Sequence, residues 1–137
     1  MRTKAREIAL WILFQKDLRG KSINDLLPLT KIPSNWDEKT ISLFLELTKN
    51  LEKREQEIDK ILGEIIEGWS LYRLAAVDRN ILRLATYELL FLPEIPANVA
   101  INEAVELGKK YGTEESGKFI NGVLGRLMKK LQTKNGM

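Results

Sequence analysis

Apolar residues recur at three- and four-residue steps along most of the chain, which is the spacing of one face of an α-helix. The first such stripe predicts a helix from about residue 3 to residue 18, with Gly20 as its stop. After a connection over residues 21–33, a second stripe predicts one long helix or two abutting helices from about residue 36 to residue 67. The polar stretch 52–57 is the weak point of this helix, because the apolar stripe thins there.

Three further helices are predicted in the second half of the chain. The pattern over residues 77–92 is apolar on nearly every side, so we expect that helix to be central. A helix from about Asn98 to Tyr111 follows, with Gly112 as its C-cap, and a last helix continues to about Leu131. Because no stretch alternates with a period of two over a useful length, the sequence predicts an all-α fold of six or seven helices.

The composition narrows the classes of function. With 137 residues, 44% of them hydrophobic and 30% charged, the chain is expected to fold as a single domain over residues 1–137. It has no cysteine and no histidine, which removes thiolate nucleophiles, zinc–thiolate sites, the commonest general base and the commonest metal ligand. It also lacks the glycine-rich motifs that bind nucleotides. We therefore expect no catalytic residue, no cofactor and no bound metal.

Two further features concern location and charge. No apolar run is long enough to cross a bilayer, and the N-terminus lacks the apolar core of a secretory signal, which predicts a soluble cytoplasmic protein with no membrane partner. The net charge is only +3. A hypothesis of nucleic-acid binding must therefore rest on where the basic residues lie.

Three cations crowd the first turn of the first helix: Arg2, Lys4 and Arg6. Like charges four residues apart repel by about 0.2–0.5 kcal/mol, and cations at a helix N-terminus oppose the macrodipole. A bound polyanion would offset both costs, because phosphates satisfy the cations and the free N–H groups together. The alternative is that the helix end frays and its charges are simply solvated.

A second candidate site lies on the last helix, where Lys118 stands beside Phe119. A cation next to an aromatic ring is the minimal unit for holding an unstacked base over a phosphate. Helical spacing also allows Phe119, Val123 and Leu127 to form an ordinary buried stripe, and this interpretation is favoured.

Asparagines and glycines interrupt the apolar residues of the last two helices. For Asn102 and Asn121 we expect a hydrogen bond between helices, because a buried amide without a partner costs about 1–3 kcal/mol. The glycines indicate close approach of another backbone, internal or from a ligand. They are Gly108, Gly117, Gly122 and Gly125.

Three stretches together resemble the NusB family of bacterial transcription antitermination factors. They are KAREIALWILFQ at 4–15, VDRNILRLATYELL at 77–90 and IPANVAINEAVELGKKYGTEESGKFINGVLGRL at 95–127. The resemblance implies an all-α protein of two roughly perpendicular three-helix halves. It also implies binding to boxA, a single-stranded RNA rich in U and A, together with the ribosomal protein NusE. The pair would nucleate an antitermination complex on RNA polymerase, notably on ribosomal RNA operons.

The resemblance also implies which residues carry these contacts. The residues implied for RNA binding are Arg2, Lys4, Arg6, Phe14, Lys118, Phe119 and Asn121. Those implied for NusE binding are Asp78, Arg83 and Glu88. Thr3 stands where arginine is frequent in the family and Asn98 where lysine is common, so the basic surface here is thinner.

Two alternatives remain open at the level of sequence. The helical surface could be a scaffold that binds other proteins, with incidental RNA contact. An exposed apolar patch could instead join two copies into a homodimer that covers the RNA face. The RNA hypothesis requires the cations at the beginning of the chain and those near its end to meet on one surface.

Overall fold

The computed structural model describes residues 2–66 and 70–134, and within these ranges the regular structure is entirely helical. The helices are α1 (Arg2–Arg19), α2 (Ile23–Leu26), α3 (Glu38–Leu45), α4 (Leu51–Lys53), α5 (Glu55–Ile65), α6 (Ala76–Phe91), α7 (Ala97–Tyr111) and α8 (Ser116–Lys134). The predicted all-α class is confirmed. No helix in the described ranges is both long and apolar enough to cross a membrane.

Helix α1 follows the first predicted stripe closely. It buries one face through small and branched side chains, Ala5, Ala9, Ile12 and Leu13. Gly20 ends it with φ of +69°, a conformation that only glycine adopts freely, and its N–H donates to the carbonyl of Lys16. The predicted stop is therefore confirmed.

The second stripe forms abutting helices rather than one. Asp37 caps α3 by accepting a hydrogen bond from the Thr40 N–H. A π-helical turn over Glu46–Asn50 leads into α4, and the helical path breaks at Arg54, whose φ and ψ are −108° and 6°. Arg54 lies within the stretch that the sequence marked as weak, where few apolar side chains hold the helix against its neighbours.

Helix α6 is the central helix, as predicted. Every residue from Arg79 to Glu88 on it is buried, and it packs against α1, α5, α7 and α8. A short 3₁₀ turn over Leu71–Arg73 precedes it. The burial of polar residues on this helix, including Arg83, means that each must find a partner inside the protein.

Helices α7 and α8 pack closely. A Cβ atom added to Gly108 would lie 2.7 Å from Cδ1 of Ile120, so the glycine lets the two helices approach. Gly117 faces Lys109 in the same contact, whereas Gly122 and Gly125 face open space. The predicted close approach is thus internal at Gly108 and Gly117 only.

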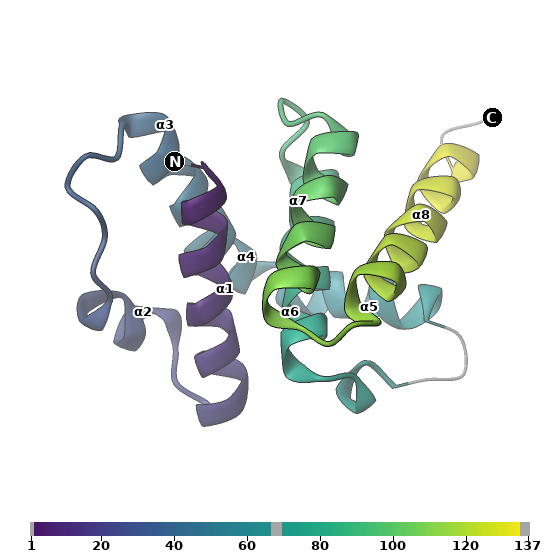
Figure 1. Cartoon of the computed structure of the whole chain (residues 1–137), viewed down its shortest axis with the longest axis horizontal. Helices are drawn as coiled ribbons and strands as arrows, with labels where there is room; N and C mark the ends of the chain where they lie inside the picture. Colours follow the sequence, from purple (N-terminus) through teal and green to yellow (C-terminus); the bar gives the residue numbers. More distant parts are fainter. Residues whose placement is uncertain (1, 67–69, 135–137) are drawn as a thin grey trace.

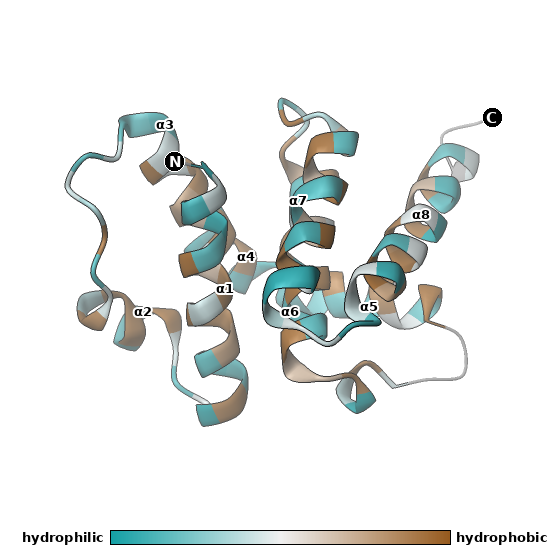
Figure 2. Ribbon diagram, viewed as in Figure 1, coloured by the Kyte–Doolittle hydropathy of each residue, from teal (hydrophilic) through white to brown (hydrophobic). Residues whose placement is uncertain are grey.

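The helices fall into two groups, and the contact between α1 and α6 joins them. In Figure 1, α1, α2 and α3 form one side of the molecule, and α7 and α8 form the other. Each long helix carries both hydrophobic and hydrophilic residues (Figure 2), and the buried apolar side chains of α1, α3 and α5 to α8 form one continuous cluster. This core packs α7 against α6 and α8, and side-chain hydrogen bonds, from Thr3 to Glu103 and from Tyr111 to Glu7, place α7 beside α1 at the candidate site.

Candidate nucleic-acid interface

The cations at the start of α1 point in different directions. Arg6 lies in the interior, where Nη2 is 2.7 Å from Glu88 Oε1 and Nη1 is 3.2 Å from Glu103 Oε1. The side chain of Arg6 is only 3% exposed. The sequence placed Arg6 on an RNA surface, and this is corrected here: its helical position turns it toward α6, and its charge is used within the fold.

The buried carboxylate that receives Arg6 is itself perturbed. Burial raises the pKa of Glu88, and the nearby Glu103 carboxylate raises it further, while the hydrogen bond from Arg6 opposes both effects. Thr3 completes the cluster by donating to Glu103 at 2.7 Å. The cluster ties α1 to α6 and α7.

Arg2 and Lys4 remain accessible but face different neighbours. Arg2 is exposed and lines a hollow with Lys39 and Glu94, on the side of α1 toward α3. Lys4 is 60% exposed and its Nζ lies 4.0 Å from Glu7 Oε1, on the side toward α7. Successive helical residues are turned by about 100°, which separates these side chains.

Glu7 joins α1 to the end of α7. Its Oε2 accepts hydrogen bonds from Lys110 Nζ at 2.5 Å and from the Tyr111 hydroxyl at 2.8 Å. Partial burial favours a raised pKa for Glu7, but these hydrogen bonds and the charges of Lys110 and Lys4 lower its pKa overall. Lys110 itself is 62% exposed, so this junction presents positive charge to solvent.

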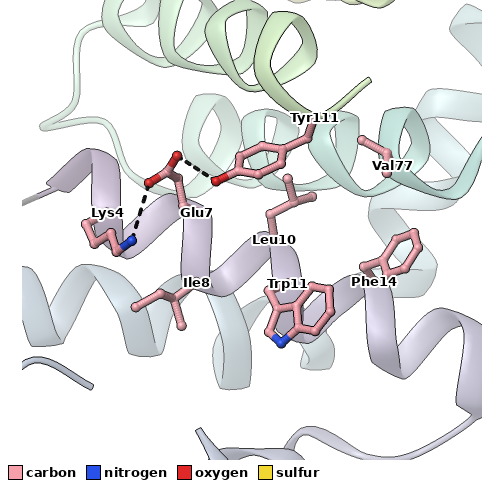
Figure 3. Close-up of a pocket in the computed structure, with 8 residues that line it drawn as sticks. All are labelled: Lys4, Glu7, Ile8, Leu10, Trp11, Phe14, Val77 and Tyr111. Carbon is pink, nitrogen blue, oxygen red and sulfur yellow. Dashed lines mark hydrogen bonds and ion pairs between the residues drawn. The ribbon is translucent and has the colours of Figure 1, made fainter. Parts of the chain in front are cut away.

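An aromatic hollow of about 330 Å³ opens beside this junction. Figure 3 shows Trp11 and Phe14 side by side on α1, with Tyr111 of α7 opposite them. The Trp11 and Phe14 rings are stacked, with centroids 6.3 Å apart and planes 11° from parallel. Ile8, Leu10 and Val77 complete the apolar lining. The predicted residue Phe14 therefore lies in a pocket with exposed rings and a charged edge.

The α8 candidates divide by exposure. Lys118 and Asn121 are exposed, and within residues 2–66 and 70–134 Lys118 has no ion-pair partner. Phe119 is half-buried and packs against the core, as the favoured interpretation predicted. Asn102 is also exposed, so the expected buried hydrogen bond between helices is wrong for both asparagines.

The accessible cations lie on three adjoining helices. The start of α1 contacts α7 through Thr3 and Glu7, and the start of α8 contacts the end of α7, where an added Cβ at Gly112 would meet Ser116. Figure 1 shows α7 between α1 and α8. Lys4, Lys110 and Lys118 thus come from adjoining elements of the fold.

The three residues implied for NusE binding are placed unequally. Arg83 is buried and held by Asp59, with Nε 2.8 Å from Oδ1 and Nη2 2.9 Å from Oδ2. Glu88 is buried against Arg6. Asp78 is half-buried, and its Oδ1 accepts no hydrogen bond from any residue that the structure describes. Both carboxylate oxygens of Glu88 accept hydrogen bonds from Arg6, whereas Asp78 Oδ1 has no hydrogen-bond donor among the described residues.

Sequence reasoning missed three members of this surface: Trp11, Lys110 and Tyr111. A signal existed for Trp11, because a large ring lies off the buried stripe of its helix. No comparable signal existed for Lys110 and Tyr111. Their role depends on α7 lying beside Glu7, which is a tertiary contact.

The chain is similar to known proteins over nearly its whole length. A family model described as the NusB family matches residues 3–129. The transcription antitermination protein NusB of Desulfitobacterium hafniense is 44% identical over 136 residues, covering 98% of this chain and 92% of that protein.

Solved structures agree with this. T. maritima NusB has a TM-score of 0.87 at 40% identity, covering 95% of this chain and 92% of that one. A crystal structure of the antitermination factors NusB and NusE in complex with dsRNA has a TM-score of 0.80 at 32% identity. The match covers 94% of this chain and 96% of that one.

Proposed function

This chain belongs to the NusB family of transcription antitermination proteins, and we propose that it binds boxA-type single-stranded RNA together with NusE. Its role is non-enzymatic. In this proposal the protein acts in the cytoplasm, within an antitermination complex on RNA polymerase, and supports transcription of ribosomal RNA operons.

The observation that carries the RNA proposal is the set of accessible lysines on the adjoining helices α1, α7 and α8, of which Lys4 lines an aromatic hollow and Lys110 lies beside its Tyr111 ring. Lys4, Lys110 and Lys118 supply charge for phosphates, which provide most of the affinity for RNA. Phe14 and its neighbouring rings offer a surface for a base. A base can enter such a hollow only when it is unstacked, so the site favours a single strand over a duplex.

Asp78 is the residue that we propose for the NusE contact. Asp78 is half-buried, whereas Arg83 and Glu88 are buried, so of the three implied residues it alone presents part of its side chain at the surface. Arg83 and Glu88 support that surface indirectly, since both are engaged in internal ion pairs that hold α6 in place.

The test is a titration of a fluorescently labelled U/A-rich single strand, followed by anisotropy, with and without NusE. We expect binding that NusE strengthens, because both ligands occupy one complex, and we expect Lys118→Glu to weaken it several-fold. The RNA in the related complex is described as dsRNA, so an unlabelled duplex of the same sequence serves as competitor. The duplex should compete poorly.

The alternatives give different results in the same experiment. A scaffold with incidental RNA contact would bind NusE, yet RNA affinity would be the same with and without it. A homodimer that covers the RNA face would show a mass of two chains by light scattering, and adding RNA would shift it toward one. Absence of RNA binding under all conditions would overturn the proposal.

A further inference from the structure

Trp11 is an exposed aromatic side chain at the centre of the α1 surface. It is 59% exposed, although a tryptophan is among the residues with most to gain from burial. Its ring lies nearly parallel to that of Phe14, with the centroids 6.3 Å apart, and most of the indole faces solvent. An accessible ring that lies parallel to a second ring is suited to stacking with another flat group.

Trp11 stands between two hollows. The first is the 330 Å³ hollow that extends toward Tyr111. The second has a volume of about 260 Å³ and extends toward the segment after α2, where its lining includes Gln15, Leu29 and Lys31. Trp11 and Ile8 belong to both hollows, so the two depressions meet at the indole.

Positive charge flanks this double hollow at both ends. Lys4 lines the first hollow, and Lys110 lies 5.3 Å from the centroid of the Tyr111 ring at its edge. Lys31 lines the second hollow and is exposed, with no ion-pair partner among the residues described. Glu7 also lines the first hollow, but its carboxylate is paired with Lys4 and Lys110. An apolar peptide or the same face of a second copy would meet lysines at both ends, whereas a polyanion with flat, apolar bases matches both the rings and the lysines.

We propose that Trp11 is a base-stacking site for single-stranded RNA, and that the strand crosses it from the hollow at Tyr111 to the hollow at Lys31. This inference rests on the proposed RNA-binding function and extends it. It adds a stacking residue on α1 and brings the segment of residues 26–31 into contact with RNA. The bases on either side of the stacked one occupy the two hollows, and Lys110 and Lys31 receive the phosphates at the two ends.

The experiment compares Trp11→Ala, Trp11→Phe and Lys31→Glu with wild type in the anisotropy titration. Loss of one base–aromatic stack corresponds to about 1–3 kcal/mol, so Trp11→Ala should weaken binding by about 5- to 150-fold. Trp11→Phe keeps a ring and should bind within a few-fold of wild type. Lys31→Glu should weaken binding several-fold. Lys60→Glu, an exposed lysine of α5 outside both hollows, is the matched control and should bind as wild type does.

Tryptophan fluorescence gives a second readout that does not depend on affinity. A stacked base quenches the indole, so RNA should quench the wild-type protein. Trp11→Phe, measured at saturating RNA, should lose that quenching while still binding. Melting curves should show unchanged midpoints for these variants, because the substituted side chains are exposed.

Several results would overturn this inference. If Trp11→Ala binds as tightly as wild type while Lys118→Glu binds weakly, Trp11 is not a stacking site, yet the proposed function stands. If wild type binds no RNA, both fail together. If wild type is a dimer and Trp11→Ala a monomer with unchanged RNA affinity, the surface belongs to a second copy of the chain.

Discussion

At the scale of single residues, the charge of Arg6 has become part of the interior. Its guanidinium lies between α1, α6 and α7, where Glu88 and Glu103 accept its hydrogen bonds. Such a pair is costly to desolvate, and it stabilises the protein only while both partners are present. Removing one partner leaves a charge without its counter-ion in a medium of low dielectric.

Arg6→Ala is therefore expected to lower the free energy of unfolding by about 3–5 kcal/mol, because it leaves Glu88 buried and unpaired. Arg2→Ala, at an exposed position one turn earlier, should change it by less than about 0.5 kcal/mol. Urea unfolding followed by circular dichroism measures both. Equal stability of the two variants would mean that the Arg6 cluster does not hold α1 against α6.

The sequence could not predict the direction in which Arg6 points. The apolar stripe of its helix identifies a buried face, but a cation at the edge of that face can turn outward to solvent or inward to a carboxylate. The choice depends on Glu88 and Glu103, which lie 82 and 97 residues away. For the same reason, Lys110 could not be assigned to the surface that Lys4 shares.

At the scale of elements, the contact between α7 and α8 determines where Lys118 is presented. Gly108 lets the helices approach until Ile120 fills the space where a side chain would lie. The start of α8 is thereby held beside the end of α7 and near Lys110. The exposed glycines of α8 have no such role, because nothing lies within 4 Å of a Cβ built on Gly122.

Alanine substitutions separate these two kinds of glycine. Gly122→Ala should raise the free energy of unfolding by up to about 1 kcal/mol, because alanine favours the helix and meets no neighbour. Gly108→Ala also favours the helix, but its methyl group overpacks against Ile120, so it should lower the free energy of unfolding by about 1–3 kcal/mol. Thermal and urea unfolding measure both. A stabilised Gly108→Ala variant would show that α7 and α8 do not need this close approach.

Much of the architecture at this scale could be predicted from periodicity. The central position of α6 follows from its apolar residues on all sides, and the break at Arg54 follows from the thin stripe over residues 52–57. The π-helical turn before α4 could not be predicted, since it depends on packing. The prediction of a buried hydrogen bond for Asn102 and Asn121 was wrong for a related reason. Both lie between apolar neighbours in the sequence, yet helical geometry turns both toward solvent.

At the scale of the whole molecule, the two groups of helices are joined by a second buried ionic network. Asp17 at the end of α1 accepts from Arg79 Nε at 2.7 Å and from Arg83 Nη1 at 3.3 Å, and Arg83 continues to Asp59 on α5. The Arg6 cluster joins the other end of α1 to α6 and α7. Together the two clusters fix α1 against α6, so the lysines of α1 and α7 keep their spacing without a ligand.

We predict that RNA binds across α1, α7 and α8, and the salt dependence of RNA affinity measures the contribution of their lysines. Phosphate contacts by Lys4, Lys110 and Lys118 contribute about −2 to the slope of log affinity against log salt, at about −0.7 per contact on a single strand, and the contact proposed for Lys31 brings the slope to about −2.8. The double variant Lys4→Glu/Lys118→Glu should make the slope shallower by about 1.4, whereas Lys60→Glu should leave it unchanged. An unchanged slope in the double variant would contradict the account.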